Sequence, residues 1–255
     1  MTQNANITVT IPVLHNWNYT KECLESLFET STLVNEIIVI DNDKYGDTAK
    51  LLIDDWDVSV YAPGKNLGVA ISWDTGIKMA NNNIVAVVNN DIKMLTKDWD
   101  KVLLEQWSHY PDAFAFCPWP SGSANEKLNP ENQPYSGLNG SFFVVDRERL
   151  RLTDNYKLKG QYIDHLYEQA YWEDADLLVQ IREAGGDAYV TPKVQTVHYS
   201  NKTAGPLLPS DKGMHNPYWR NLDYFNKKYG VMIWDYFKVF MSNVQDENTN
   251  ERLIS

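Results

Sequence analysis

The chain has 255 residues, of which 43% are hydrophobic and 22% are charged, and its formal net charge is −11. This length is sufficient for one sizeable α/β domain, and the hydrophobic content is too high for a disordered chain. The acidic charge and the lack of any long basic segment exclude nucleic acid as an expected partner.

The first ninety residues alternate between predicted strands and predicted helices. Apolar runs indicate four strands, at residues 7–13, 36–41, 58–61 and 84–88. Apolar residues at helical spacing indicate the helices between them, at residues 19–28, 47–56 and 69–80. Consecutive strands that are joined by helices lie parallel in one sheet, so the pattern predicts a parallel sheet with helices on both faces.

The pattern is less regular in the second half of the chain. It indicates helices at residues 99–106, 172–184 and 218–229, and strands at 113–116, 141–145, 187–191 and 194–197. Residues 118–139 are rich in Pro, Gly, Ser and Asn, which predicts a long loop. Long loops inside compact domains often carry function, so this segment is a candidate part of a site.

The predicted strand at 84–88 ends in three polar residues, Asn89, Asn90 and Asp91. Ligands of open parallel sheets bind beyond the carboxyl ends of the strands. A carboxylate flanked by amide oxygens supplies the hard oxygen ligands that Mg²⁺ or Mn²⁺ prefers, and such a metal would hold a substrate diphosphate. The alternative is that these residues only form the turn after the strand.

Two later stretches also carry candidate functional groups. Three acids, Glu173, Asp174 and Asp176, lie at the start of a predicted helix, directly after an aromatic pair. The alternative explanation is that acids in a first turn complement the helix dipole. His198 ends a predicted strand, either as a packed rim histidine or as an imidazole ligand that completes a metal site begun by Asp91.

Four stretches together resemble the family 2 (GT2) glycosyltransferases of the GT-A fold, and in particular the rhamnosyltransferase-like branch. The first is "ITVTIPVLHNWNYTKECLESLF", and the second joins "EIIVIDN" to "GKNLGVAISWDTGIKMANNNIVAVVNNDI". The others are "GLNGSFFVVDRERL" and "WEDADLLVQIREAGGDAYVTPKVQTVHYS". The resemblance covers residues 7–200 and implies an α/β, Rossmann-like and mostly parallel central sheet, with helices on both faces and a small antiparallel addition on the acceptor side.

The resemblance also implies roles for individual residues. Asp91, in a variant of the DxD motif, and His198 would bind Mn²⁺ or Mg²⁺. Asp174 would be the general base, with Glu173 as the second choice. The residues that would bind the donor nucleotide are Pro12, Leu14, Asp41, Asn66, Asn90 and Asp91. The residues that would bind the acceptor or the sugar include Asn139 and Gly140.

Aromatic and C-terminal residues complete the candidate site. The aromatic candidates to stack on sugar faces, with filling of the core as the alternative, are Trp119, Tyr171 and Trp172. Residues 200–216 are rich in turn formers, and we expect this segment to close over the nucleotide as a lid. Lys202 and His215 of the segment are candidate diphosphate contacts.

Helical geometry separates the three acids of the predicted catalytic helix. Successive residues are about 100° apart, so Glu173, Asp174 and Asp176 cannot all face one substrate. Asp174 shares the side that is marked by the apolar residues of the helix, one turn nearer its start, and Glu173 shares part of that side. Asp176 is rotated by about 200° from Asp174, which predicts a surface or capping position.

The predicted reaction is a metal-assisted, inverting transfer of a sugar from a nucleotide-diphosphate sugar to a hydroxyl group of a glycan or another acceptor. The alternative enzyme is a nucleotidyltransferase that makes a nucleotide sugar. Its phosphate-binding loop usually needs Gly and basic residues, and "PVLHNWNYT" contains no Gly, Lys or Arg. The alternative without catalysis is a carbohydrate-binding protein that has kept the fold and lost the chemistry. No oligomeric state is predicted.

The expected organisation is one domain at residues 1–200, with a nucleotide-binding half at about 1–95 and an acceptor-side half at about 96–200. Residues 201–255 are expected to add the lid and a helical extension to the same domain. The N-terminus lacks the segments of a signal peptide, and no apolar run is long enough to span a bilayer. We therefore expect a cytoplasmic protein without a transmembrane segment, whose two cysteines are reduced.

Overall fold

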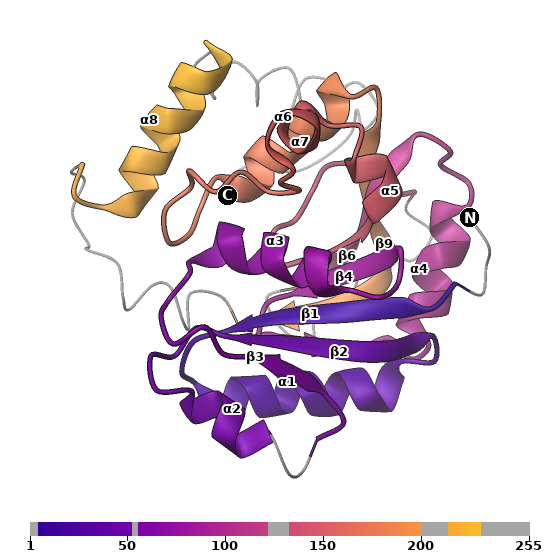
Figure 1. The fold of residues 1–255 in the computed structure, drawn as a ribbon. Coiled ribbons are helices and arrows are strands. Elements are labelled where there is room, and N and C mark those ends of the chain that lie inside the picture. The colour runs from indigo at the N-terminus through magenta and orange to yellow at the C-terminus, as the bar shows by residue number, and fades with distance from the viewer. Residues whose placement is uncertain (1–4, 53–55, 122–132, 200–213, 231–255) are drawn as a thin grey trace, which may run out of the picture.

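The computed structural model describes residues 5–52, 56–121, 133–199 and 214–230. Its strands are β1 (Ile7–Val13), β2 (Val34–Asp41), β3 (Ser59–Tyr61), β4 (Ile84–Val88), β5 (Ile92–Met94), β6 (Ala113–Ser121), β7 (Tyr135–Ser136), β8 (Phe142–Asp146) and β9 (Asp187–His198). Within these residues they form one nine-stranded sheet in the order β3-β2-β1-β4-β8-β6-β9-β5, with β7 paired to β9 (Figure 1).

The helices cover both faces of this sheet (Figure 1). They are α1 (Trp17–Thr30), α2 (Asp47–Leu52), α3 (Val69–Met79), α4 (Trp99–Trp107), α5 (Arg147–Leu150), α6 (Asp154–Lys159), α7 (Glu173–Glu183) and α8 (Pro217–Tyr229). α1 and α4 pack on one face, whereas α3, α7 and α8 pack on the other. None of the described helices is both long and apolar enough to span a membrane.

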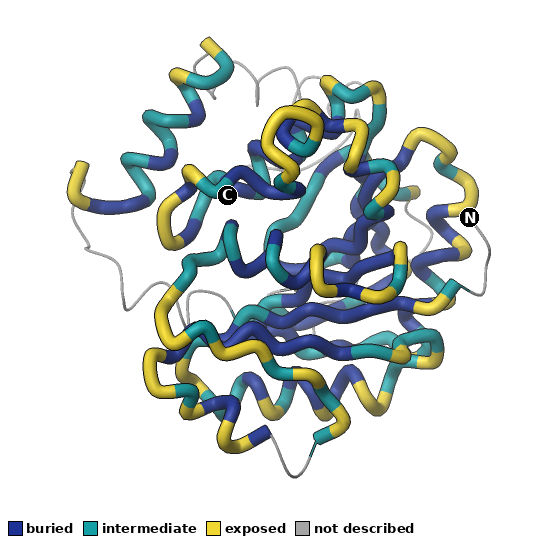
Figure 2. The backbone as a smooth tube through the Cα atoms, viewed as in Figure 1, coloured by how far each residue is buried: buried dark blue, intermediate teal, exposed yellow. Residues whose placement is uncertain are grey.

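The first half of the sheet confirms the predicted parallel arrangement. β1 pairs in parallel with β2 and with β4, and β2 pairs in parallel with β3. Alternate residues of β4 contact the two core clusters, with Ala86 on one side and Val85 and Val87 on the other. A strand that is covered on both faces is apolar throughout. Figure 2 shows β1 and β4, in the middle of the sheet, buried along almost all of their length.

The second half of the sheet is the predicted antiparallel addition. β8 pairs antiparallel with β4 and β6, and β9 pairs antiparallel with β5 and β7 but parallel with β6. β9 is one strand, although two short strands were predicted. Its register against β6 jumps between Thr191 and Gln195, and this irregularity accommodates Pro192, which cannot donate a ladder hydrogen bond.

Several short elements were not predicted. β5, α5 and α6 have three, four and six residues. Such lengths are too short for apolar periodicity to show. β6 also continues to Ser121, into the predicted loop at 118–139, of which residues 122–132 lie outside the described part.

α3 approaches the sheet closely because residue 76 is glycine. A Cβ added at Gly76 would lie 1.8 Å from Oγ1 of Thr10 in β1. Both residues are buried, so a larger side chain would force the helix away from the strand. This contact holds α3 against β1, with the start of the helix near the carboxyl edge of the sheet.

The C-terminal part of the chain is described only in part. Residues 214–230 contain α8, which is the predicted last amphipathic helix. Asn216 caps it by accepting a hydrogen bond from the N–H of Tyr218, and Gly230 ends it in the left-handed conformation. Most of the predicted lid and extension, at 201–213 and 231–255, lies outside the described residues.

Candidate active site

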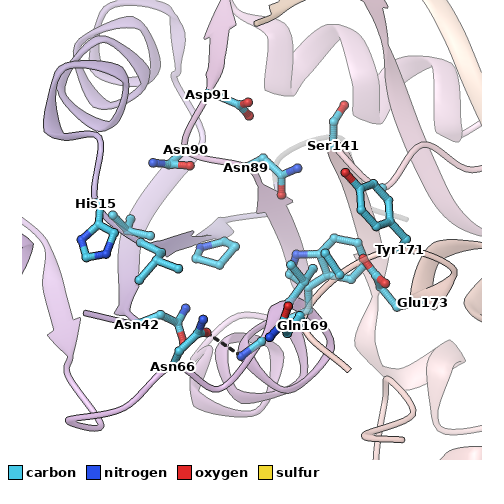
Figure 3. Close-up of a pocket in the computed structure, with 18 of the residues that line it drawn as sticks. His15, Asn42, Asn66, Asn89, Asn90, Asp91, Ser141, Gln169, Tyr171 and Glu173 are labelled. Atoms are coloured by element: carbon cyan, nitrogen blue, oxygen red, sulfur yellow. Dashed lines mark hydrogen bonds between the residues drawn. The ribbon is translucent and has the colours of Figure 1, made fainter. Parts of the chain in front are cut away.

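A cavity of about 860 Å³ lies at the carboxyl ends of β1, β2 and β4. Its opposite wall is the start of α7 with the segment that precedes this helix (Figure 3). The predicted donor and metal residues that line it are Pro12, Leu14, Asn66, Asn90, Asp91 and His198. The predicted acceptor and catalytic residues that line it are Asn139, Gly140, Tyr171, Trp172, Glu173 and Asp174.

A pair that the sequence analysis missed, His15 and Asp43, lines the donor side of the cavity. His15 follows β1 in a left-handed conformation with a φ of 56°, and its Nδ1 lies 2.6 Å from Oδ2 of Asp43. The other oxygen of Asp43 accepts a hydrogen bond from the N–H of Tyr45 at 2.8 Å. The only signal in the sequence was the position of both residues just past strand ends.

The prediction for Asp41 needs correction, because this residue does not line the cavity. Its side chain is fully buried, and it accepts hydrogen bonds from the N–H groups of Asp43 at 3.0 Å and Ala49 at 2.8 Å. Both oxygens are therefore engaged in shaping the turn from β2 into α2. Asp43, two residues further along, is the acid that reaches the cavity.

The loop before α3 is fixed to the end of β2 by Asn42. Its Oδ1 accepts a hydrogen bond from the N–H of Leu67 at 2.9 Å, and its Nδ2 donates to Oγ of Ser72 at 3.0 Å. Within the same loop, Oδ1 of Asn66 accepts from the N–H of Gly68. These bonds hold the exposed Asn66 at the rim of the cavity, where the sequence placed a donor contact.

The three polar residues after β4 have separate structural tasks. The N–H of Asn89 donates to the carbonyl oxygen of Ser141, and Nδ2 of Asn90 donates to Oγ1 of Thr20 in α1. Asp91 is left to face His198, with 3.3 Å between Oδ1 and Nε2. The backbone of Asn89 and the side chain of Asn90 thus tie the strand end to its neighbours, and Asp91 presents a carboxylate at the cavity.

Asp91 and His198 fit the predicted metal site as two of its ligands, because carboxylate and imidazole groups both bind Mn²⁺. Within the described parts of the chain, no group of three or more His, Cys, Asp and Glu side chains is suited to hold a metal. A metal on Asp91 and His198 therefore needs further oxygen ligands, which water or a bound diphosphate supplies.

Glu173 and Asp174 lie on the opposite wall of the cavity. They begin α7, and the loop before β8 passes close to them. A Cβ added at Gly140 of that loop would lie 2.7 Å from Oδ2 of Asp174, so only glycine permits this approach. Asn139 shapes the loop, because its Oδ1 accepts hydrogen bonds from the N–H and the hydroxyl group of Ser141.

The two neighbouring acids differ in their surroundings. Burial, together with the charge of Asp174, raises the pKa of Glu173 to about 8, and Oε2 of Glu173 has no hydrogen-bond partner in the described structure. Burial also raises the pKa of Asp174, but the N–H groups of Ala175 and Gly140 oppose this by stabilising the ionised form. At neutral pH we therefore expect Glu173 to hold a proton, and of the two acids Asp174 is the one that ionises first.

This difference predicts how stability depends on pH in Glu173→Gln. The folded protein keeps the Glu173 proton up to about pH 8, whereas the unfolded chain loses it near pH 4. The wild type therefore loses stability as pH rises through this window, and glutamine removes that loss. We expect the variant to gain stability relative to the wild type, by up to about 1.4 kcal/mol per pH unit between pH 4 and 8.

Urea unfolding of both proteins at several pH values measures this difference. Glu105→Gln, which changes an exposed side chain on α4, reports the effect of the same substitution away from the cavity. A constant difference between Glu173→Gln and the wild type at every pH would contradict the protonated state of Glu173.

Asp176 is not the surface or capping residue that helical geometry predicted. It is 2% exposed, and its Oδ1 accepts hydrogen bonds from the hydroxyl groups of Tyr167 and Tyr229. Nζ of Lys228 lies 2.6 Å from the same oxygen. Two of these three partners belong to α8, which covers the face of α7 that the sequence pattern assigned to solvent.

The other predicted contacts lie away from the cavity or outside the described residues. Trp119 does not line the cavity and packs its ring against Tyr135, with 5.7 Å between the ring centroids. His215 is exposed, precedes α8 and does not line the cavity. Lys202 lies outside the described residues.

The sequence of the chain matches a known protein family. The profile of the family described as Glycosyl transferase family 2 matches residues 8–166, which is more than half of the chain and extends from β1 to beyond α6. The chain belongs to glycosyl transferase family 2. The matched region of this family 2 chain includes Asp91 but ends before α7 and α8. A search of curated proteins found no match.

Solved structures share the GT-A fold of this family 2 chain. GalNAc-T7 with UDP, GalNAc and Mn²⁺ has a TM-score of 0.61 at 16% identity, covering 78% of this chain and 44% of its own. The mannosyltransferase PcManGT from Pyrobaculum calidifontis, in complex with GDP-Man and Mn²⁺, has a TM-score of 0.60 at 17% identity. The match covers 80% of this chain and 59% of PcManGT. TarS from S. aureus has a TM-score of 0.57 at 14% identity, and the match covers 75% of this chain and 36% of TarS. The chain thus spans about half the length of these proteins.

Proposed function

We propose that this family 2 chain transfers a sugar from a nucleotide-diphosphate sugar to a hydroxyl acceptor, with inversion at the anomeric carbon. The observation that carries the proposal is one cavity with Asp91 and His198 on one wall and Asp174 on the other. Transfer needs both functions side by side, because the leaving diphosphate gains charge while the acceptor hydroxyl loses a proton. The complexes of similar structures with UDP and GDP-Man support this class of donor.

The donor wall would bind the nucleotide and its diphosphate. Asp91 and His198 would hold Mn²⁺ or Mg²⁺, which neutralises charge on the leaving diphosphate when it is bound. Pro12 and Leu14 form an apolar rim for the base, next to the His15–Asp43 pair. We assign Asp43 to the polar contact with the nucleobase, because Asp43 lines the cavity next to this rim and Asp41 does not.

The acceptor wall would carry the base. Asp174 accepts the proton of the acceptor hydroxyl as its oxygen attacks the anomeric carbon, and the nucleoside diphosphate leaves from the opposite face of the sugar. Glu173 in its neutral form keeps a second negative charge away from Asp174.

Within family 2 we propose the rhamnosyltransferase-like branch. The support is the Asn89-Asn90-Asp91 form of the strand end, in which the side-chain amide of Asn90 fixes a neighbouring helix and a single carboxylate faces the cavity. The linked expectation is a metal site with one carboxylate and one imidazole, and no second acid at the strand end.

A panel of UDP-, GDP- and dTDP-sugars tests the function. We expect one donor to raise the melting temperature only when Mn²⁺ is present, and to release its nucleoside diphosphate when a hydroxyl acceptor is added. Formation of pyrophosphate from a nucleoside triphosphate and a sugar phosphate would instead identify a nucleotidyltransferase. Binding without turnover of any donor would identify a carbohydrate-binding protein.

A further inference from the structure

The cavity wall beside Asp174 is built from a strained backbone segment. Gln169, Tyr171 and Trp172 have φ values of 52°, 81° and 74°, which lie in the left-handed region although none of the three is glycine. Large side chains rarely adopt this conformation, so contacts from outside the segment must hold it. All three residues line the cavity, and Glu173 and Asp174 follow directly.

Asn221 of α8 holds this segment through its side-chain amide. Its Nδ2 donates to the carbonyl oxygens of Glu168 at 2.8 Å, Ala170 at 3.0 Å and Tyr171 at 3.0 Å. Its Oδ1 accepts from the N–H of Glu168 at 2.9 Å. Asn221 is 1% exposed and does not line the cavity, so its amide serves the segment and not a ligand. Carboxylate and aliphatic side chains of similar size cannot both donate and accept in this way.

α8 is itself anchored to α7 by buried charged groups. Nζ of Lys228 lies 2.8 Å from the carboxylate of Asp164 and 2.6 Å from that of Asp176. The hydroxyl group of Tyr229 donates to Asp176 at 2.6 Å. Hydrogen-bonded charges in a buried network favour one geometry, because displacement would leave them unpaired. The network therefore fixes the position of Asn221 relative to α7.

The start of α3 holds the same segment from its other side. The N–H of Val69 donates to the carbonyl oxygen of Gln169 at 2.6 Å. A Cβ added at Gly68 would lie 3.1 Å from the backbone nitrogen of Gln169, so the two backbones are in close contact. The segment is thus held between α3, which begins beside the donor wall, and α8, and only the α8 contact uses a side-chain amide.

We propose that Asn221 is a positioning residue, whose amide imposes the left-handed conformation of Gln169, Tyr171 and Trp172 and so directs Glu173 and Asp174 into the cavity. A segment released from Asn221 would relax toward extended or right-handed φ values and turn the start of α7. The effect on catalysis rests on the proposed function, whereas the effect on the geometry of the two acids does not. α8 lies beyond the region that the family profile matches, so the match assigns it no role.

The first experiment separates catalysis from donor binding in Asn221→Ala and Asn221→Asp. The aspartate variant keeps the size and the acceptor oxygen but loses both donated protons. We expect kcat to fall by about 10- to 100-fold in each variant, because small displacements of a base are costly. We expect the Kd of the donor nucleotide with Mn²⁺ to change by less than about threefold, since Asp91, His198 and Asp43 lie on the other wall.

The control for this experiment is Asp223→Asn on the same helix, whose side chain pairs with Lys227 at the surface. It should leave both kcat and Kd unchanged. Unchanged kcat in folded Asn221 variants, or a loss of nucleotide binding as large as the loss of kcat, would overturn the positioning role. If the alanine variant does not fold, as judged by circular dichroism, the aspartate variant decides.

The second experiment needs neither substrate nor metal. Glu173→Gln is combined with each Asn221 variant, and the gain in stability between pH 4 and 8 is measured as it is in the wild-type background. If Asn221 keeps Glu173 buried, releasing the segment hydrates this acid, and the pH-dependent gain should fall to less than about half. Retention of the full gain in folded Asn221 variants would overturn the positioning role.

The two proposals therefore fail separately. If the Asn221 variants reduce the pH-dependent gain of Glu173→Gln but the wild type turns over no nucleotide sugar, the proposed function is wrong and the positioning role is retained. If the wild type is an active transferase but the Asn221 variants leave that gain unchanged, the positioning role is wrong and the proposed function is retained.

Discussion

Asp174→Asn should lower kcat by at least about a hundredfold while leaving the binding of the donor nucleotide with Mn²⁺ intact. Asparagine keeps the size of the side chain, and its Oδ1 can still accept from the N–H of Ala175. It cannot take up the proton of an acceptor hydroxyl, so only the chemical step should suffer. Steady-state kinetics with the active donor and calorimetric nucleotide binding measure the two effects.

Controls on the same helix identify which acid is the base. Glu183→Gln changes an exposed acid at the far end of α7 and should behave as the wild type. Glu173→Gln should keep most of the activity near neutral pH, because a neutral Glu173 already resembles glutamine. Near-normal kcat in Asp174→Asn, with a collapse in Glu173→Gln or Asp176→Asn, would show that another carboxylate accepts the proton.

The parallel half of the fold could be predicted because its signals are local. β4 is apolar throughout because it is covered on both faces, and the helices beside it have apolar residues at helical spacing. Polar residues that follow such a strand must either cap it or serve a ligand. Asn89, Asn90 and Asp91 do both, since two of them fix neighbouring elements and the third faces the cavity.

The positions of individual acids could not be predicted, because they depend on distant partners. The helical periodicity of α7 assigned Asp176 to solvent, but Lys228 and Tyr229 approach it from α8, fifty-two and fifty-three residues further along. Asp41 ends β2 at a position that suggested a ligand contact, but the N–H groups of Asp43 and Ala49 take both of its oxygens. Periodicity shows which side of an element is apolar and not which later segment covers the other side.

The left-handed residues were also invisible in the sequence. Glycine normally marks such positions, and Gln169, Tyr171 and Trp172 carry no such mark. What holds them is the amide of Asn221 and the backbone of α3, and neither contact leaves a periodic pattern. A strained segment at a site is therefore found from dihedral angles, after which its cause can be sought among the contacts.

Asp91→Ala should abolish the metal dependence of nucleotide binding and reduce transfer by at least about a hundredfold. The carboxylate lies 3.3 Å from Nε2 of His198, and these two side chains are the metal ligands that we propose. With one ligand removed, a divalent ion is left with the imidazole and the diphosphate. Charge stabilisation by a bound metal is worth several kcal/mol, and each 1.4 kcal/mol corresponds to about tenfold in rate.

Nucleotide titrations with Mn²⁺ and with excess EDTA measure this effect in the wild type, in Asp91→Ala and in Asp154→Ala. Asp154 is a matched control, because its side chain is 70% exposed on α6 and lies away from the cavity. EDTA should weaken binding in the wild type and in Asp154→Ala, but it should not weaken it further in Asp91→Ala. Full transfer activity in excess EDTA would contradict the metal site, because it would mean that the leaving diphosphate is stabilised by protein groups alone.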